Sequence, residues 1–190
     1  MRIGIDIDDT MCRTTEIVHE YIEKYAQEHH LNDLDIMNDE VLKREFFETY
    51  IEQIYTNAVI KRSCADVIRR LKNKGNEIYL VSARSDTFFT NTKHHVLEIT
   101  EEWLKKNGIV VDQIILDAFG DKKAEICKKY HIDIMIDDNP FNYQKILEKG
   151  CKCILFDDRA KYSLDENYAT NWIEVEKVVE KNYFDFFHRK

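Results

Sequence analysis

MRIGIDIDDT, residues 1–10 of the 190-residue chain, is a short apolar run that ends in acidic residues. The run Arg2–Ile7 is typical of a buried parallel strand whose carboxyl end opens at a site. Because residues two apart on an extended chain point to the same side, Asp6 and Asp8 should converge. Ligands of open α/β sheets bind beyond the carboxyl ends of the strands. We therefore expect a small acidic site where this first strand ends.

Four later segments have the same apolar character, and helical patterns lie between them. These segments are Glu77–Val81, Gln113–Leu116, Asp133–Ile136 and Cys151–Phe156. Gly75, Gly108 and Gly150 each stand where a helix should end in a left-handed residue. Strands that alternate with helices of this length predict an α/β fold. We expect a doubly wound, Rossmann-like parallel sheet with helices on both faces.

Residues 13–61 break this alternation, because they contain helical patterns and no strand pattern. Two such patterns are joined by the polar segment His29–Asp39. The stretch is too short to fold alone, so we expect a small helical cap that is inserted after the first strand and lies over the carboxyl ends of the strands. Residues 1–12 and 62–190 then form the α/β core.

The composition excludes several classes of protein. Lysine and arginine number 28 against 36 aspartates and glutamates, which gives a net charge of −8 at pH 7. Binders of nucleic acid or anionic membranes need clustered cations, so we expect neither partner. No apolar stretch approaches the ~20 residues that span a bilayer, and the early acids do not fit a signal peptide. We expect a cytoplasmic protein that acts on a small molecule.

The five cysteines are an odd set with no CxxC pair and no histidine at zinc-ligand spacing. Cys151 and Cys153 alternate along a predicted strand and are best explained as buried small apolar residues. At the carboxyl end, Trp172–Tyr183 predicts a final packing helix. The aromatic residues after it, which could equally form a homodimer contact, are Phe184, Phe186 and Phe187.

A second acidic pair, Asp137 and Asp138, follows the fourth predicted strand. Asn139 and Pro140 suit the cap and first turn of a helix. Because Asn139 already supplies the cap, the helix does not need the two acids before it. Carboxylates this close need a cation or a shared proton, and Mg²⁺ prefers such oxygen ligands. Asp9, by contrast, could simply cap a helix.

Asp157 and Asp158 follow the fifth strand with no matching partner, and there we expect a solvated turn.

Phosphate could be bound here without a glycine-rich loop, since the five glycines lie too far apart for either common phosphate-binding motif. Ser82 ends the second strand, where a hydroxyl and nearby backbone N–H groups can hold phosphate oxygens. Lys122 and Lys123 open the helix before the fourth strand, a position that is mildly unfavourable for a cation. Either lysine could serve a bound anion, or both could be ordinary solvated residues.

Taken together, DIDDT, LVSAR, the Lys123 region and IMIDD resemble the four motifs of the haloacid dehalogenase (HAD)-like phosphohydrolases, in the family's order. The resemblance implies that Asp6 is a nucleophile that forms an aspartyl-phosphate. It implies that Asp8 is first the general acid and then the base. Because the acid must hold a proton, crowding by other carboxylates should help Asp8.

The same resemblance implies a set of ligands. Mg²⁺ would be held by Asp6, the Asp8 backbone carbonyl, Asp137 and Asp138. Phosphate would be held by Ser82, Ala83 and Lys123. A carboxylate can attack a dianionic phosphoryl group only if such cations offset the repulsion.

Within that superfamily, the helical insert and the segments EFFETYIEQIY and TEEWLKKNGI resemble the 5′-nucleotidase group, which includes deoxyribonucleotidases. The spacing to Asp137 in that group favours Lys123 over Lys122. Two features depart from the group: Val59–Ile60 replaces a common proline, and the stretch Phe88–His95 intervenes after the second motif. The implied activity is a phosphomonoesterase for (deoxy)nucleoside monophosphates, and the alternative substrate is a sugar phosphate or another small metabolite.

The cap offers candidate substrate contacts. Phe46, Phe47, Tyr50 and Tyr55 could stack on a base and Arg44 could meet phosphate or base, although packing within the cap is the commoner reason for such an aromatic stripe.

Two explanations without an enzyme are also open. A receiver-type signalling module has its phosphoacceptor after the third strand and no insert, whereas this chain has its second acidic pair after the fourth strand. An inactive phosphate-binding module is disfavoured, because all four motif positions keep competent side chains.

Overall fold

The computed structural model describes residues 1–89, 96–162 and 167–188, with side chains as far as Asn182. Within these residues, six strands form one sheet in the order β3-β2-β1-β4-β5-β6, and every pair is parallel. The strands are β1 Arg2–Ile5, β2 Glu77–Val81, β3 Gln113–Ile115, β4 Ile134–Asp137, β5 Lys152–Phe156 and β6 Tyr168–Ala169. The doubly wound parallel sheet is therefore confirmed. The two-residue β6, which the sequence pattern missed, pairs with the edge of β5.

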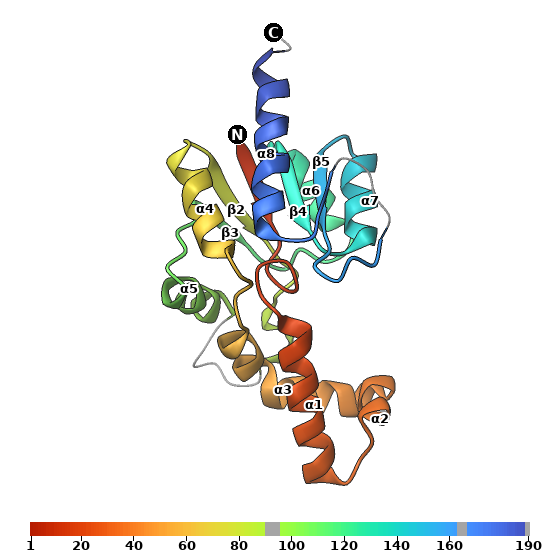
Figure 1. Ribbon diagram of the computed structural model, residues 1–190. Coiled ribbons are helices and arrows are strands. Elements are labelled where there is room, and N and C mark those ends of the chain that lie inside the picture. Colours follow the sequence, from red (N-terminus) through yellow and green to blue (C-terminus); the bar gives the residue numbers. More distant parts are fainter. Residues whose placement is uncertain (90–95, 163–166, 189–190) are drawn as a thin grey trace.

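Helices cover both faces of the sheet (Figure 1). They are α4 Cys64–Asn73, α5 Val96–Lys106, α6 Lys122–Lys129, α7 Pro140–Glu148 and α8 Trp172–His188. One core cluster packs α4 and α8 against Ile3 and Ile5 of β1. A second packs α6 and α7 against Met135 and Cys153. Apolar residues on both sides of each central strand explain the continuous apolar runs in the sequence.

Gly4 in β1 is needed for close packing between the central strand and its neighbour. A Cβ atom at this position would stand 2.6 Å from the Met135 Sδ atom. Each of the five cysteines, all of them among the described residues, is free, and only Cys151 is partly exposed. Cys153 is a buried packing residue, as predicted.

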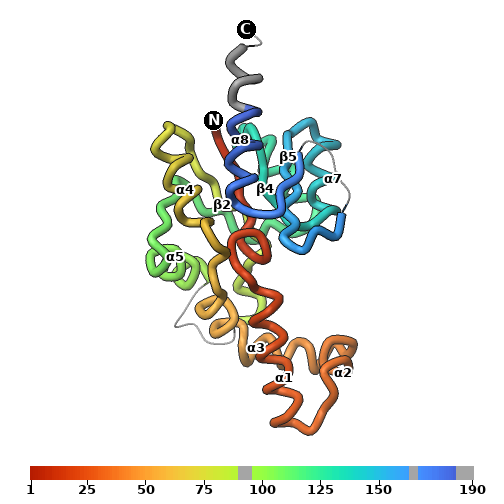
Figure 2. Tube along the Cα trace, viewed as in Figure 1, coloured from red at the N-terminus to blue at the C-terminus, as the bar shows by residue number. Residues whose placement is uncertain are grey.

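Residues 13–61 form helices that project beyond the carboxyl ends of the strands (Figures 1 and 2). These are α1 Thr14–His29, α2 Asp33–Asn38 and α3 Glu40–Asn57. The short α2 lies within the segment that we expected to be a polar connection, and it forms because Ile36 is fully buried against α1 and α3. The three helices share an apolar cluster of their own.

The chain enters and leaves the cap side by side. Arg13 N donates to Val59 O at 2.9 Å, and Lys61 N donates to Met11 O at 2.8 Å. A 3-10 turn, η1 Asp86–Phe88, contacts α3 from the core, while residues 90–95 of the predicted intervening stretch lie outside the described residues. None of the helices in the described part of the chain has the length and apolar character that a membrane span requires.

Candidate active site

Asp6, Asp137 and Asp138 meet where two neighbouring strands end. Asp6 follows β1, and its backbone N–H donates to Ile136 O of β4 at 2.9 Å. One carboxylate oxygen from each of the three acids lies within 4.8 Å of the others. Asp6 and Asp137 are buried, and Asp138 is partly exposed. The structure thus brings together side chains that are about 130 residues apart in the chain.

Lys123 bridges two of these acids. Its Nζ atom lies 2.7 Å from Asp6 Oδ1 and 2.7 Å from Asp137 Oδ2. Burial alone would lower the pKa of Lys123, but the two carboxylates raise it, so the ammonium group stays charged. Lys122 is exposed, and its Nζ donates to the Asp117 carbonyl at 3.4 Å. Of the two candidate lysines, the structure places Lys123 among the acids.

The carboxyl groups of this cluster repel one another. Burial raises the pKa of Asp6 well above its usual range, and Asp137 and Asp138 raise it further against the opposing effect of Lys123. Burial, Asp137 and Asp9 raise the pKa of Asp138 to about 6. Three carboxylates and one ammonium group leave an excess of negative charge at the cluster. Carboxylate oxygen atoms are also the ligands that Mg²⁺ prefers. The donor set therefore fits a divalent cation.

Asp8 is held by Arg84 rather than crowded by acids. Arg84 Nε donates to both Asp8 carboxylate oxygens at 3.1 and 3.0 Å, and Thr14 Oγ1 donates to Asp8 Oδ1 at 2.6 Å. Burial raises the pKa of Asp8, but the Arg84 charge and these hydrogen bonds lower it more. The expectation that carboxylate crowding keeps Asp8 protonated is therefore wrong in this structure.

Arg84 is the site residue that the sequence interpretation missed. Its side chain is fully buried, and its guanidinium carbon lies 4.2 Å from the centre of the Tyr55 ring. Nη1 has no hydrogen-bond partner among the described residues. An arginine three residues after a buried strand was visible in LVSAR, but its partner Asp8, in the segment after β1, is 76 residues away. Tyr55, a candidate base contact, packs on this guanidinium instead.

Ser82 lies at the same edge of the sheet, since β2 pairs with β1 in a register that sets Leu80 opposite Ile5. The Ser82 side chain is fully buried, and its Oγ accepts from Arg84 N at 3.2 Å. Ala83 beside it is partly exposed. Ser82 and Ala83 therefore lie at the end of β2, on the same edge of the sheet as the acidic cluster at the ends of β1 and β4.

Short polar residues fix the loops around the cluster. Thr10 Oγ1 and Asp138 contact each other twice at 3.1 Å, through the carboxylate and the backbone N–H. Asp9 accepts from Thr15 N at 3.0 Å in the first turn of α1, the helix-capping role considered for it. Asn139 Oδ1 accepts from Phe141 N at 2.9 Å, as predicted for a helix cap.

The cap aromatic residues divide into two groups. Phe46 is fully buried and Tyr50 nearly so, and both belong to the apolar cluster of the cap. They cannot stack on a substrate in this arrangement, because the cap helices cover them. Phe47 is partly exposed, and its ring centre lies 5.3 Å from that of Phe88. Arg44 is exposed and pairs with Glu48 along α3.

The pair after β5 is not the solvated turn that we expected. Asp157 is only 7% exposed and accepts hydrogen bonds from three backbone N–H groups and from the Tyr168 hydroxyl. Asp158 Oδ2 lies 2.5 Å from the buried Lys61 Nζ. Both carboxylates therefore have partners: Asp157 accepts from the loop after β5, and Asp158 pairs with Lys61.

Solved structures share the fold of this chain. The chain aligns with a haloacid dehalogenase-like hydrolase from Streptococcus pneumoniae with a TM-score of 0.64 and 12% identity, over 94% of this chain and 97% of the other. The fold is that of the HAD-like hydrolases. A predicted phosphatase from Clostridium acetobutylicum gives a TM-score of 0.68 at 13% identity, over 95% and 98% of the two chains.

A sequence relative covers nearly the whole of this chain. The Bacillus subtilis protein named "Putative nucleotidase YqfW" is 27% identical over 96% of this chain and 95% of its own length. No family model matches the chain. The chain therefore has a HAD-like fold, and a relative named as a putative nucleotidase matches it over nearly the full length of both proteins.

Proposed function

We propose that this protein is a Mg²⁺-dependent phosphomonoesterase that forms an aspartyl-phosphate on Asp6, with (deoxy)nucleoside 5′-monophosphates as its substrates. The observation that carries the proposal is Asp6 beside Lys123 and the Asp137–Asp138 pair, at the carboxyl edge of a HAD-like sheet. The nucleoside part rests on the relative named as a nucleotidase. Residues 13–61 act as the cap and the remainder as the core. We place the protein in the cytoplasm.

In the first half-reaction, a carboxylate oxygen of Asp6 bonds to phosphorus while the bond from phosphorus to the leaving oxygen breaks. Asp8 gives its proton to that oxygen. Lys123, Ser82 and the Ala83 backbone N–H group bind the phosphoryl oxygens. Mg²⁺ on Asp6, the Asp8 carbonyl, Asp137 and Asp138 would neutralise the charge that builds up on the phosphoryl group.

In the second half-reaction, Asp8 removes a proton from water, which attacks phosphorus and frees inorganic phosphate and the Asp6 carboxylate. The Arg84 contact suits this step, because it keeps Asp8 ionised and ready to accept a proton. The first step needs Asp8 in its protonated form. Asp8 must therefore take up a proton before the first step.

Hydrolysis of p-nitrophenyl phosphate tests the chemistry. Purified protein should hydrolyse it with Mg²⁺, stop when EDTA is added, and lose activity in the Asp6→Asn variant. A rate that survives EDTA, or an active Asp6→Asn protein, contradicts the mechanism.

A substrate panel tests the nucleotidase part separately. Deoxynucleoside and ribonucleoside 5′-monophosphates should give higher kcat/KM values than sugar monophosphates. If sugar monophosphates are preferred by orders of magnitude, the nucleotidase proposal fails while the phosphatase chemistry stands.

A further inference from the structure

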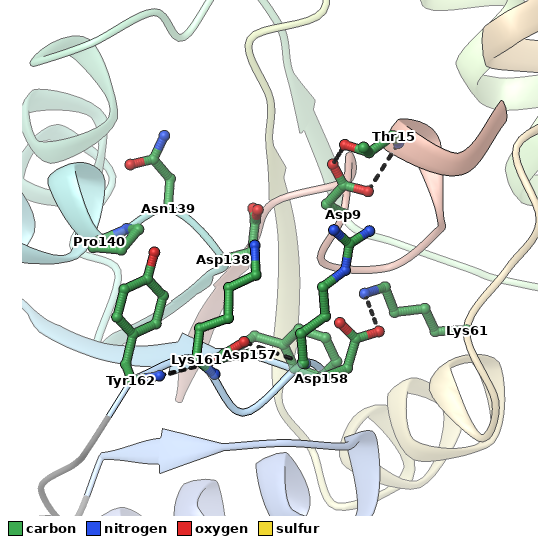
Figure 3. Close-up of a pocket in the computed structure, with 12 residues that line it drawn as sticks. Asp9, Thr15, Lys61, Asp138, Asn139, Pro140, Asp157, Asp158, Lys161 and Tyr162 are labelled. Carbon is green, nitrogen blue, oxygen red and sulfur yellow. Dashed lines mark hydrogen bonds and ion pairs between the residues drawn. The ribbon is translucent and has the colours of Figure 1, made fainter. Parts of the chain in front are cut away.

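A cavity of about 330 Å³ opens next to the acidic cluster (Figure 3). Asp138, Asn139 and Pro140 line one side of it, and the loop of residues 157–162 after β5 lines the other. Asp138 belongs both to this wall and to the acidic cluster. A group bound in the cavity would therefore be a close neighbour of a phosphoryl group bound at Asp6.

The loop wall has a defined conformation, which the buried Asp157 carboxylate imposes. The carboxylate accepts from the backbone N–H groups of Arg159 at 3.2 Å, Lys161 at 2.5 Å and Tyr162 at 3.0 Å. Figure 3 shows the bonds that join Asp157 to this loop. A carboxylate that takes several N–H donors is a strong anchor, because each bond is charge-assisted. The loop side chains are thus presented on a fixed backbone.

Most charged groups in the wall already have partners. Lys61 is paired with Asp158, and its ammonium group lies 4.8 Å from the centre of the Phe156 ring. Asp157 is used by the loop, and Asp9 is bonded to Thr15. Asp138 stands with the acids of the proposed metal site. The cavity wall therefore offers little unpaired negative charge once that site is filled.

Arg159 and Lys161 are the exceptions. Both are exposed at the cavity, and neither has a carboxylate within ion-pair distance among the described residues. In Figure 3 the Lys161 side chain extends toward Asp138. The loop thus presents two cationic side chains to the cavity in a chain with a net charge of −8. Arginine and lysine side chains that line one cavity suit a phosphate or carboxylate group.

We propose that this cavity binds a second anionic group of the substrate, with Arg159 and Lys161 as its ligands and Asp157 as the residue that positions them. This inference rests on the proposed phosphomonoesterase function. It narrows the substrate to phosphomonoesters whose leaving group carries a second phosphate or a carboxylate. Nucleosides and sugars can both supply that chemistry.

Paired substrates test the proposal. We compare a nucleoside 3′,5′-bisphosphate with the 5′-monophosphate, and a hexose 1,6-bisphosphate with the 6-phosphate. In at least one pair, the substrate with two phosphates should have a kcat/KM about tenfold higher, the factor that one good charge-assisted contact supplies. The pair that shows the preference identifies the source of the second group.

Variants show whether the loop cations cause the preference. The double variant Arg159→Ala, Lys161→Ala should raise the KM of the preferred bisphosphate about tenfold and leave kcat for that substrate nearly intact. Lys149→Ala is the matched control, because it removes an exposed cation just before β5, at the opposite end of the strand from the loop. It should leave the preference unchanged. Asp157→Asn should weaken the preference in a protein that still melts cooperatively.

The outcomes separate the two proposals. If p-nitrophenyl phosphate is hydrolysed but neither bisphosphate is preferred, or if the double variant keeps the preference, the inference is overturned and the proposed function stands. If no phosphomonoester is hydrolysed, the proposed function fails and the inference fails with it.

Discussion

The same dipeptide, Asp-Asp, stands at the carboxyl ends of two adjacent parallel strands of this protein, and these two copies have different environments. At the end of β4, Asp137 contacts Lys123 and stands with Asp138 beside Asp6. After β5, Asp157 accepts hydrogen bonds from its own loop and Asp158 pairs with Lys61. The difference comes from neighbours in the sheet, since β4 lies next to β1 and β5 does not. Position in the sheet, and not the dipeptide, places one pair in the acidic cluster and gives the other its contacts with the loop and with Lys61.

The largest effect should come from Asp137→Asn. The variant keeps the shape of the side chain but removes the charge that faces Lys123 and a proposed metal ligand. We expect kcat with p-nitrophenyl phosphate to fall on the order of a thousandfold. Steady-state kinetics at saturating Mg²⁺ measures the fall in kcat. A loss of less than about tenfold would show that Asp137 is not part of the proposed catalytic site.

Asp157→Asn is the matched substitution on β5 and should act mainly on stability. The amide offers one acceptor oxygen in place of two, so some of the loop N–H groups lose their charged acceptor, and the free energy of unfolding should fall by about 2 kcal/mol. Urea denaturation followed by circular dichroism gives this value. If the variant lost activity as severely as Asp137→Asn and kept its stability, the contrast between the two pairs would be false.

Asp158→Ala should have a smaller effect. It leaves the buried Lys61 ammonium group without its carboxylate, while the cation still lies over the Phe156 ring. Because Asp158 is partly exposed, we expect a loss of about 1 kcal/mol in the free energy of unfolding. The double variant Asp158→Ala, Lys61→Met should be more stable than Asp158→Ala alone, because it no longer carries an unpaired buried cation. A double variant that is less stable than either single variant, by the sum of the two losses, would show that the two side chains act independently.

The smallest effect should come from Glu176→Gln, a reference carboxylate far from both pairs. Hydrogen bonds from Arg70 lower the pKa of Glu176, so its contribution is present above the unfolded pKa and disappears as pH falls through the folded value. Arg70 is partly exposed, and we expect a loss of about 0.5 kcal/mol at pH 7. Melting curves should show this difference shrinking as the pH falls below the usual range of a glutamate. A difference that grows on acidification contradicts the pairing.

Local patterns predicted the sheet and the cap, because apolar runs and helical periodicity are properties of neighbouring residues. They located Asp6, Asp137 and Asp138 for a related reason: parallel strands end at one edge, so the chain order alone brings these residues together. The sequence missed β6 because two residues carry no pattern. It missed α2 because the helix depends on one buried side chain, Ile36.

The remaining errors concern partners that are distant in the chain. Nothing near Asp8 shows that Arg84 will pair with it, and nothing near Asp158 shows that Lys61 will. Phe46 was a candidate for substrate contact because its spacing fits a helix face, and that face is the inner one. Pairings of this kind depend on how the loops cross the strand ends, which local periodicity does not specify.

The most direct test of the central proposal is the covalent state of Asp6 during turnover. The protein is mixed with p-nitrophenyl phosphate and Mg²⁺, quenched in acid within milliseconds, digested and examined by mass spectrometry. The account predicts one added phosphoryl group on Asp6 in the peptide that contains residues 1–13, and none in the Asp6→Asn protein. An active enzyme that never carries phosphate on Asp6, or that carries it on another residue, would contradict the account.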